Sequence, residues 1–150
     1  MIVALAVHVL AAVIWIGGMF FAYLVLRPAL HPLEPPVRLA TWERVFSRFF
    51  LWVWLTIVAL FASGPTMVSL EFGGFSTVSP YVQVMMTLGV VMVLIYLYLY
   101  FVPWRHFRAA VTSTNWLAAE TQIKRMRRLV ATNLLLGLLT VIVGASGRFY

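Results

Sequence analysis

The chain of 150 residues contains no cysteine and no aspartate, and its only acidic residues are 4 glutamates. The absence of cysteine excludes disulfides, thiolate metal sites and thiol catalysis. The glutamates are isolated and lie outside the apolar segments, so a Ser–His–acid triad or a pair of catalytic carboxylates has no candidates. No Asp, Glu or Lys lies within an apolar segment to form a proton relay. Hydrolytic, thiol and ion-pump chemistry are therefore not expected.

Charge of either sign is scarce, at 10% of residues, whereas 63% are hydrophobic and the mean hydropathy is +0.98. Four segments carry no charge at all: 1–26, 49–70, 72–104 and 129–147. Each is long enough for the roughly 20 apolar residues that cross a bilayer. The sequence predicts an all-α integral membrane four-helix bundle in one domain, 1–150. The predicted helices are approximately 2–26, 49–70, 81–102 and 129–147.

Prolines and flanking segments set the predicted boundaries. Pro28, Pro32, Pro35 and Pro36 make a continuous helix through the first loop unfavourable. The second helix is expected to end near 63–65 or slightly beyond. Short helical stretches, 38–48 and 116–128, are expected to lead into the second and fourth helices.

The basic residues, which give a net charge of +7, gather in the first and third loops. The second loop holds only an acidic residue, Glu71. The positive-inside rule predicts cytoplasmic first and third loops, with both termini outside (N-out/C-out). This multi-pass membrane arrangement explains the charge more simply than binding to nucleic acid, which we do not expect.

His8 is the clearest polar group within a predicted span, where polar residues are costly and need a reason. At 100° per residue it shares a helix face with Trp15, Gly18 and several alanines. Small residues beside an imidazole leave space that either a flat macrocycle or a neighbouring helix could fill. Both interpretations are open from spacing alone.

Other candidate site residues lie at a similar predicted depth near the outer surface. They are Met67, Gln83 and Met86, with Arg148 just above them. Gln83 and Met86 share a helix face, including Val90 and Leu94, that we expect to point into the bundle. This set supplies the axial His, thioether and propionate-binding Arg that haem b needs. His8 and Met86 would also suit copper(I).

Several stretches resemble the CopD-like family of bacterial inner-membrane proteins, which is named for copper resistance and uptake. They are 8–19, with its His–Trp–Gly–Gly spacing, 26–30, 98–104, 133–137 and 144–148. The layout is also similar to HemJ-type protoporphyrinogen oxidases, four-helix membrane proteins with a haem-linked histidine on the first helix. The resemblance implies that His8 is a haem or metal ligand in a bacterial inner membrane with periplasmic termini. The lysine that the HemJ pattern places early in the third helix is absent here.

Three hypotheses follow. The first is a haem b protein that transfers electrons in the membrane, for example from quinol to a periplasmic acceptor, and it leaves open whether the protein is an oxidoreductase. The second is a copper uptake or resistance protein that uses His and Met ligands without haem and has a periplasmic copper partner. The third is a non-catalytic accessory subunit of a membrane complex. A homo-oligomer is compatible with each.

Overall fold

The computed structural model describes residues 1–74 and 78–147, and every regular element within them is a helix. In chain order these are α1 (Ile2–Phe20), the π-helix η1 (Phe21–Leu26), α2 (Arg27–Leu30), α3 (Pro35–Phe72), α4 (Pro80–Phe101), α5 (Pro103–Thr112) and α6 (Trp116–Ser146). They make four helical columns long and apolar enough to cross a membrane: Ile2–Leu30, Pro35–Glu71, Pro80–Thr112 and Trp116–Ser146. The prediction of an all-α protein with four transmembrane helices is confirmed.

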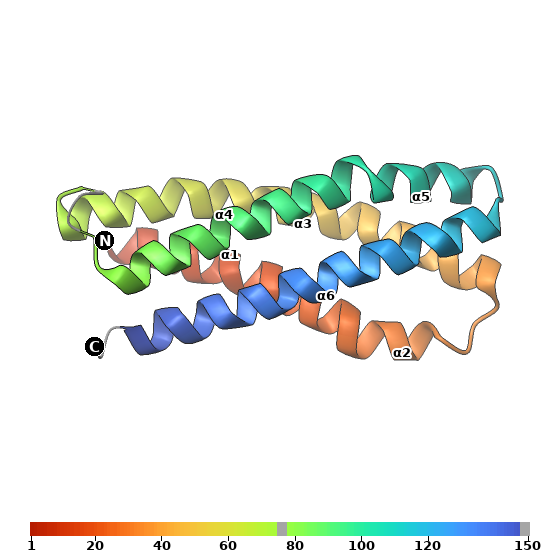
Figure 1. Ribbon diagram of the computed structural model, residues 1–150, viewed down its shortest axis with the longest axis horizontal. Coiled ribbons are helices and arrows are strands. Elements are labelled where there is room, and N and C mark those ends of the chain that lie inside the picture. Colours follow the sequence, from red (N-terminus) through yellow and green to blue (C-terminus); the bar gives the residue numbers. More distant parts are fainter. Residues whose placement is uncertain (75–77, 148–150) are drawn as a thin grey trace.

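The columns run side by side (Figure 1). The two ends of the bundle differ in composition. The start of α1, the end of α3, the start of α4 and the end of α6 lie together at what we call the terminal end. The opposite end, which we call the basic end, holds α2, α5 and the first turns of α3 and α6. It carries the basic residues of 27–48 and 105–128.

The first column is longer than predicted, because it continues through η1 and α2 to Leu30. Pro28 explains the π-helix: it has no N–H to donate, and in an α-helix its ring would collide with the carbonyl four residues earlier. The chain adopts a wider turn instead, in which the Arg27 N–H reaches back five residues to the Ala22 carbonyl. The expected break after residue 26 is therefore confined to residues 31–34.

The second column is one unbroken helix, so the 38–48 stretch and the 49–70 span join directly in α3. Its two leading prolines occupy the first turn, where a missing N–H leaves no intrahelical bond unmade. Pro65 lies inside the helix, which continues to Phe72 and ends at Gly73 with a left-handed φ of 69°. Glycine adopts this conformation without a steric penalty.

The second half of the chain follows the predicted order and adds one helix. α4 (Pro80–Phe101) lies within a residue of the predicted 81–102 segment at each end. Val102 leaves helical geometry, with φ −113° and ψ −82°, and Pro103 then begins α5, which was not predicted. The 116–128 stretch and the final span form the single helix α6, whose first turn is capped by Asn115 accepting from the Ala118 N–H at 3.1 Å.

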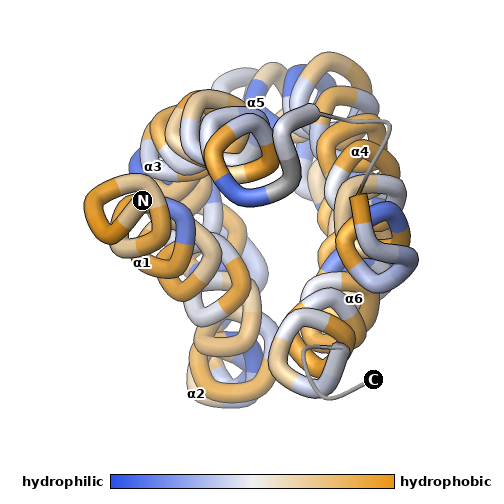
Figure 2. The backbone as a smooth tube through the Cα atoms, turned by 90° about the vertical axis from the view of Figure 1, so that its left-hand side faces the viewer, coloured by the Kyte–Doolittle hydropathy of each residue, from blue (hydrophilic) through white to orange (hydrophobic). Residues whose placement is uncertain are grey.

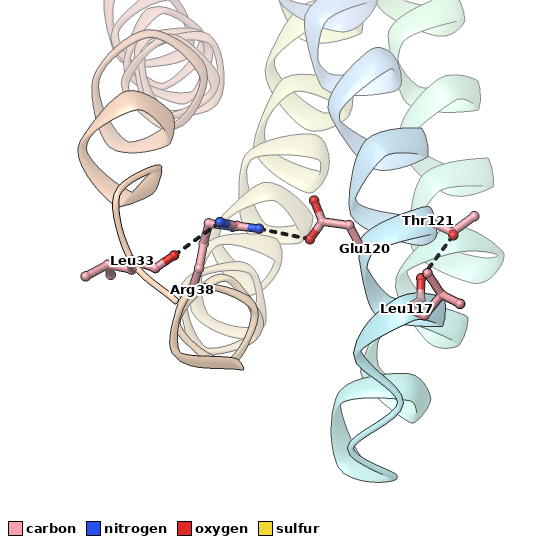
Figure 3. Close-up of polar contacts among 5 residues, drawn as sticks. All are labelled: Leu33, Arg38, Leu117, Glu120 and Thr121. Carbon is pink, nitrogen blue, oxygen red and sulfur yellow. Dashed lines mark hydrogen bonds and ion pairs between the residues drawn. The ribbon is translucent and has the colours of Figure 1, made fainter. Parts of the chain in front are cut away.

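The columns pair as two hairpins: α1 packs on α3, and both α4 and α5 pack on α6. Viewed from the terminal end, α1 stands on one side and α4 and α6 on the other (Figure 2). At the basic end an ion pair joins the hairpins, with Arg38 Nη2 3.1 Å from Glu120 Oε2 (Figure 3). The same guanidinium also donates to the Leu33 carbonyl at 3.2 Å, which fastens the turn before α3 (Figure 3).

An aromatic core joins the first three columns in the half of the bundle nearer the basic end. Phe50 is at its centre, with edge-to-face contacts to Trp104 at 5.1 Å and Tyr96 at 5.7 Å between ring centroids. Tyr96 also meets Trp15 edge-on at 6.2 Å, and its hydroxyl donates to the Phe50 carbonyl at 3.2 Å. These contacts satisfy a buried phenol in apolar surroundings and fix the relative positions of α1, α3 and α4.

The inward face expected on the third helix is wrong. Met86, Val90 and Leu94 are exposed on α4, the last at 59%. The buried residues of this helix are Met92, Tyr96 and Leu99. Because apolar residues cover almost the whole circumference of a transmembrane helix, periodicity alone does not separate the lipid-facing side from the protein-facing side.

Candidate functional site

The imidazole of His8 contacts α3 rather than the centre of the bundle. Its Nδ1 lies 3.0 Å from the Ser63 Oγ. The Ser63 hydroxyl donates its one hydrogen to the Ala59 carbonyl at 2.6 Å. The oxygen can then only accept from the imidazole. His8 is therefore the tautomer that carries its proton on Nδ1, and the lone pair of Nε2 is free.

This arrangement is the usual preparation of a histidine ligand. A metal-binding imidazole donates its other N–H to an oxygen, which fixes the ring orientation and the tautomer. The ring also lies beside Gly64, where a Cβ would be 3.6 Å from His8 Cε1, an ordinary van der Waals contact. Ser63 is therefore the residue of α3 that positions the ring.

Met67 is the soft-ligand candidate on the same side of α3. It follows Ser63 by four residues, so it lies on the same helix face one turn nearer the terminal end. It is half-buried. Met67 thus lies one helical turn from the serine that holds the His8 ring. Within 1–74 and 78–147, no group of three or more His, Cys, Asp or Glu side chains could hold a metal, so a metal here would need sulfur.

Gln83 and Met86 lie apart from this pair. Gln83 donates to the Val78 carbonyl at 3.1 Å, which helps to close the start of α4. Met86 is 41% exposed, and its neighbour Met85 is the one that packs on α6, against Gly144. α4 packs on α6 and α5 and has at most marginal contact with α1. Arg148, the candidate for a propionate, lies outside the described residues.

Trp15 and Gly18 are occupied by helix packing. Trp15 is 3% exposed and belongs to the aromatic core. At Gly18 a Cβ would collide with the Phe49 ring, so the absent side chain is what lets α3 approach α1. Of the two interpretations of this small-residue face, the neighbouring helix is the one observed. Haem b therefore does not fit along the face where the sequence placed it.

The sequence places two buried polar groups, Ser63 and Asn133, on expected inward faces of the second and fourth helices, but gives neither a role in the site. Ser63 shares its predicted helix face with Thr56, Ala59 and Thr66, but its pairing with His8 depends on the register of α1 against α3. Asn133 is 4% exposed at mid-height of α6, and its Oδ1 has no hydrogen-bond partner. For Asn133, the signal in the sequence was a lone amide within an apolar span.

Together these features define a class: a four-helix membrane protein with one oriented imidazole towards the terminal end and an aromatic core behind it. Residues 43–146 match the family model described as CopD, copper resistance protein D, and the chain belongs to that family. A protein of Aquifex aeolicus (strain VF5), described as uncharacterized, is 30% identical over 145 residues, which cover 96% of this chain and 92% of that protein. No solved structure matches the chain. The matched range contains Ser63 and Met67 but not His8.

Proposed function

We propose that this protein handles copper, and that it binds copper(I) through the Nε2 of His8 and the thioether of Met67. The observation that carries the proposal is the hydrogen bond from His8 Nδ1 to Ser63 Oγ, 3.0 Å long, which leaves Nε2 free. The family description, copper resistance protein D, supports copper as the cargo.

The ligand chemistry favours copper(I) over harder ions. Imidazole and thioether are neutral, so the site itself buries no charge besides the single positive charge of the ion. Magnesium and calcium need carboxylate or carbonyl oxygens, and structural zinc takes four ligands, usually thiolate and imidazole. The acidic residue nearest to Met67 along α3 is Glu71, one turn beyond it and exposed.

The position of the site supports capture from the side on which the termini lie. His8 and Met67 are at the terminal end, whereas the aromatic core closes the bundle towards the basic end. The positive-inside rule places the basic end in the cytoplasm and the terminal end in the periplasm. Copper would thus be taken from, or returned to, a periplasmic partner, and passage beyond His8 would require Trp15, Phe50 and Tyr96 to move.

A copper(I) competition titration tests this function. The detergent-purified protein is titrated without oxygen against a coloured copper(I) chelator, alongside His8→Ala and Met67→Leu. We expect one copper per chain, and an affinity at least tenfold lower in each variant. Met86→Leu is the matched control and should bind as the unchanged protein does. A loss in Met86→Leu but not in Met67→Leu would transfer the second ligand to α4.

An absorption spectrum tests the haem b alternative in the same preparation. With haem supplied during expression, we expect no Soret band. A Soret band that His8→Ala abolishes would replace the copper proposal with membrane electron transfer, with quinol as a candidate donor. Copper binding that persists unchanged in His8→Ala would exclude His8 as the ligand. A protein that binds neither copper nor haem would leave a non-catalytic accessory subunit as the better interpretation.

A further inference from the structure

A small cavity at the basic end lies where η1, α2, α3 and α6 meet. Its lining includes two arginines, Arg27 and Arg127, together with Tyr23, Trp42 and Phe46. Arg27 and Tyr23 also line an open groove beside it, which continues along α2 to His31. The cavity and the groove therefore share one wall, formed by η1 and the start of α2.

The two arginines bring like charges together in a lining that contains no carboxylate. The charge of Glu120 reaches Arg127, but this carboxylate is already paired with Arg38. Arg27 and Arg127 are both half-buried. The ion pairs among residues 1–74 and 78–147 are Arg38–Glu120 and Arg108–Glu43, so neither arginine of the cavity is in one. Arg27 instead lies over the Tyr23 ring, 5.2 Å from its centroid. Two unpaired guanidiniums in one partly desolvated lining are unfavourable unless an anion lies between them.

The π-helix is what builds this wall. Tyr23 lies within η1 and Arg27 follows it directly, and both residues line the cavity and the groove. Pro28 imposes this turn at the point where the uncharged segment 1–26 ends. Arg127 likewise comes just before the uncharged segment 129–147. Both guanidiniums therefore lie at the level where a hydrocarbon core meets phosphate headgroups.

We propose that Arg27 and Arg127 hold the phosphate group of an anionic phospholipid, with its glycerol and headgroup in the groove beside His31. The planar guanidinium donates two parallel hydrogen bonds to phosphate oxygens, and two such forks match one phosphodiester. Free phosphate offers the same oxygens. The lipid is favoured because the groove opens on the lateral face of the first column, at the edge of its apolar span.

Native mass spectrometry of the full chain in detergent tests this site. The probes are dioctanoyl phosphatidylglycerol, dioctanoyl phosphatidylcholine and inorganic phosphate. We expect one bound phosphatidylglycerol per chain, preferred at least tenfold over phosphatidylcholine, and loss of that preference in Arg27→Gln/Arg127→Gln. Arg44→Gln/Arg125→Gln removes the same charge from exposed positions on α3 and α6 and should keep the preference.

Each other outcome overturns the proposal. Equal loss in the two double variants would mean diffuse attraction to a basic surface. Phosphate that binds alone as tightly as phosphatidylglycerol and displaces it would mean a free-phosphate site. No preference in the unchanged protein would mean no site. Circular dichroism checks that the double variant folds. If it does not, the same binding measurement is made on Arg127→Gln and on Arg27→Lys/Arg127→Lys. If both of these variants keep the full preference for phosphatidylglycerol over phosphatidylcholine, the proposal is overturned.

Discussion

At the basic end of the bundle, rings of α3, α4 and α5 pack around Phe50, and an ion pair joins the two hairpins. At the terminal end, large apolar side chains face outward, among them Ile2 at 84% exposed and Ile142 at 62%. At this end, a hydrogen bond between His8 and Ser63 links α1 to α3. The basic end is thus held by packed rings and an ion pair, whereas the terminal end holds a polar group oriented between α1 and α3.

Two phenylalanines on α3 test this contrast with the largest expected effect. Phe50 is 3% exposed and Phe61 is 53% exposed. Phe50→Ala removes a ring from the centre of the core and should destabilise the protein by about 3 kcal/mol, because the surrounding rings cannot close the cavity. Phe61→Ala should cost less than about 1 kcal/mol. Unfolding in detergent followed by circular dichroism measures both, and equal losses would remove the contrast.

Two adjacent glycines on α1, at the boundary between the two halves of the bundle, give a second test of the contrast between its ends. A Cβ at Gly18 would collide with Phe49, whereas one at Gly17 would meet nothing within 4 Å. Gly18→Val should therefore cost about 1–3 kcal/mol, and Gly17→Val should change stability by less than about 0.5 kcal/mol. Thermal melting of the two variants compares their stabilities. A Gly18→Val protein as stable as Gly17→Val would show that α3 does not need this close approach.

A serine pair tests the orientation of the imidazole at the terminal end. Ser63→Ala removes the oxygen that holds the His8 Nδ1–H and should weaken copper(I) binding about tenfold, with stability nearly unchanged. Ser69→Ala is the control, because that hydroxyl is exposed and bonds only to the Pro65 carbonyl at 3.0 Å. The competition titration measures both variants. Unaltered affinity in Ser63→Ala would mean that the tautomer is not fixed by this bond.

The smallest effect concerns the ion pairs of the basic end. Arg38 and Glu120 have side chains 21% and 28% exposed, so a double-mutant cycle with glutamine should give a coupling of about 1 kcal/mol. The longer Arg108–Glu43 pair, at 3.5 Å with Arg108 65% exposed, should give less than about 0.5 kcal/mol. Raising the salt concentration should reduce the second more than the first. Equal couplings would mean that burial does not separate these pairs.

The features predicted correctly from the sequence depend on the length of the apolar segments and on where charged residues are placed. Four uncharged segments of span length required four apolar helices, and segregated arginines distinguished one end from the other. Where the chain turned was harder: Pro28 was expected to help end the first helix, but a π-turn absorbs it. A proline ends a helix only if no alternative hydrogen-bond pattern is available.

The candidate site was predicted in part, for a reason that lies in packing. His8 was found because a polar group in an apolar span is conspicuous. Ser63 as its partner required the register of two helices, and the exposure of Met86 required knowing which side of α4 faces α6. In a membrane both sides are apolar, so these facts come only from the assembled bundle.

X-ray absorption at the copper edge of the protein loaded with one copper(I) tests the central claim most directly. The account predicts a first shell with imidazole nitrogen and thioether sulfur. The sulfur signal should vanish in Met67→Leu and stay in Met86→Leu, and the imidazole scattering should vanish in His8→Ala. A shell without sulfur, or an imidazole signal that survives in His8→Ala, would contradict it.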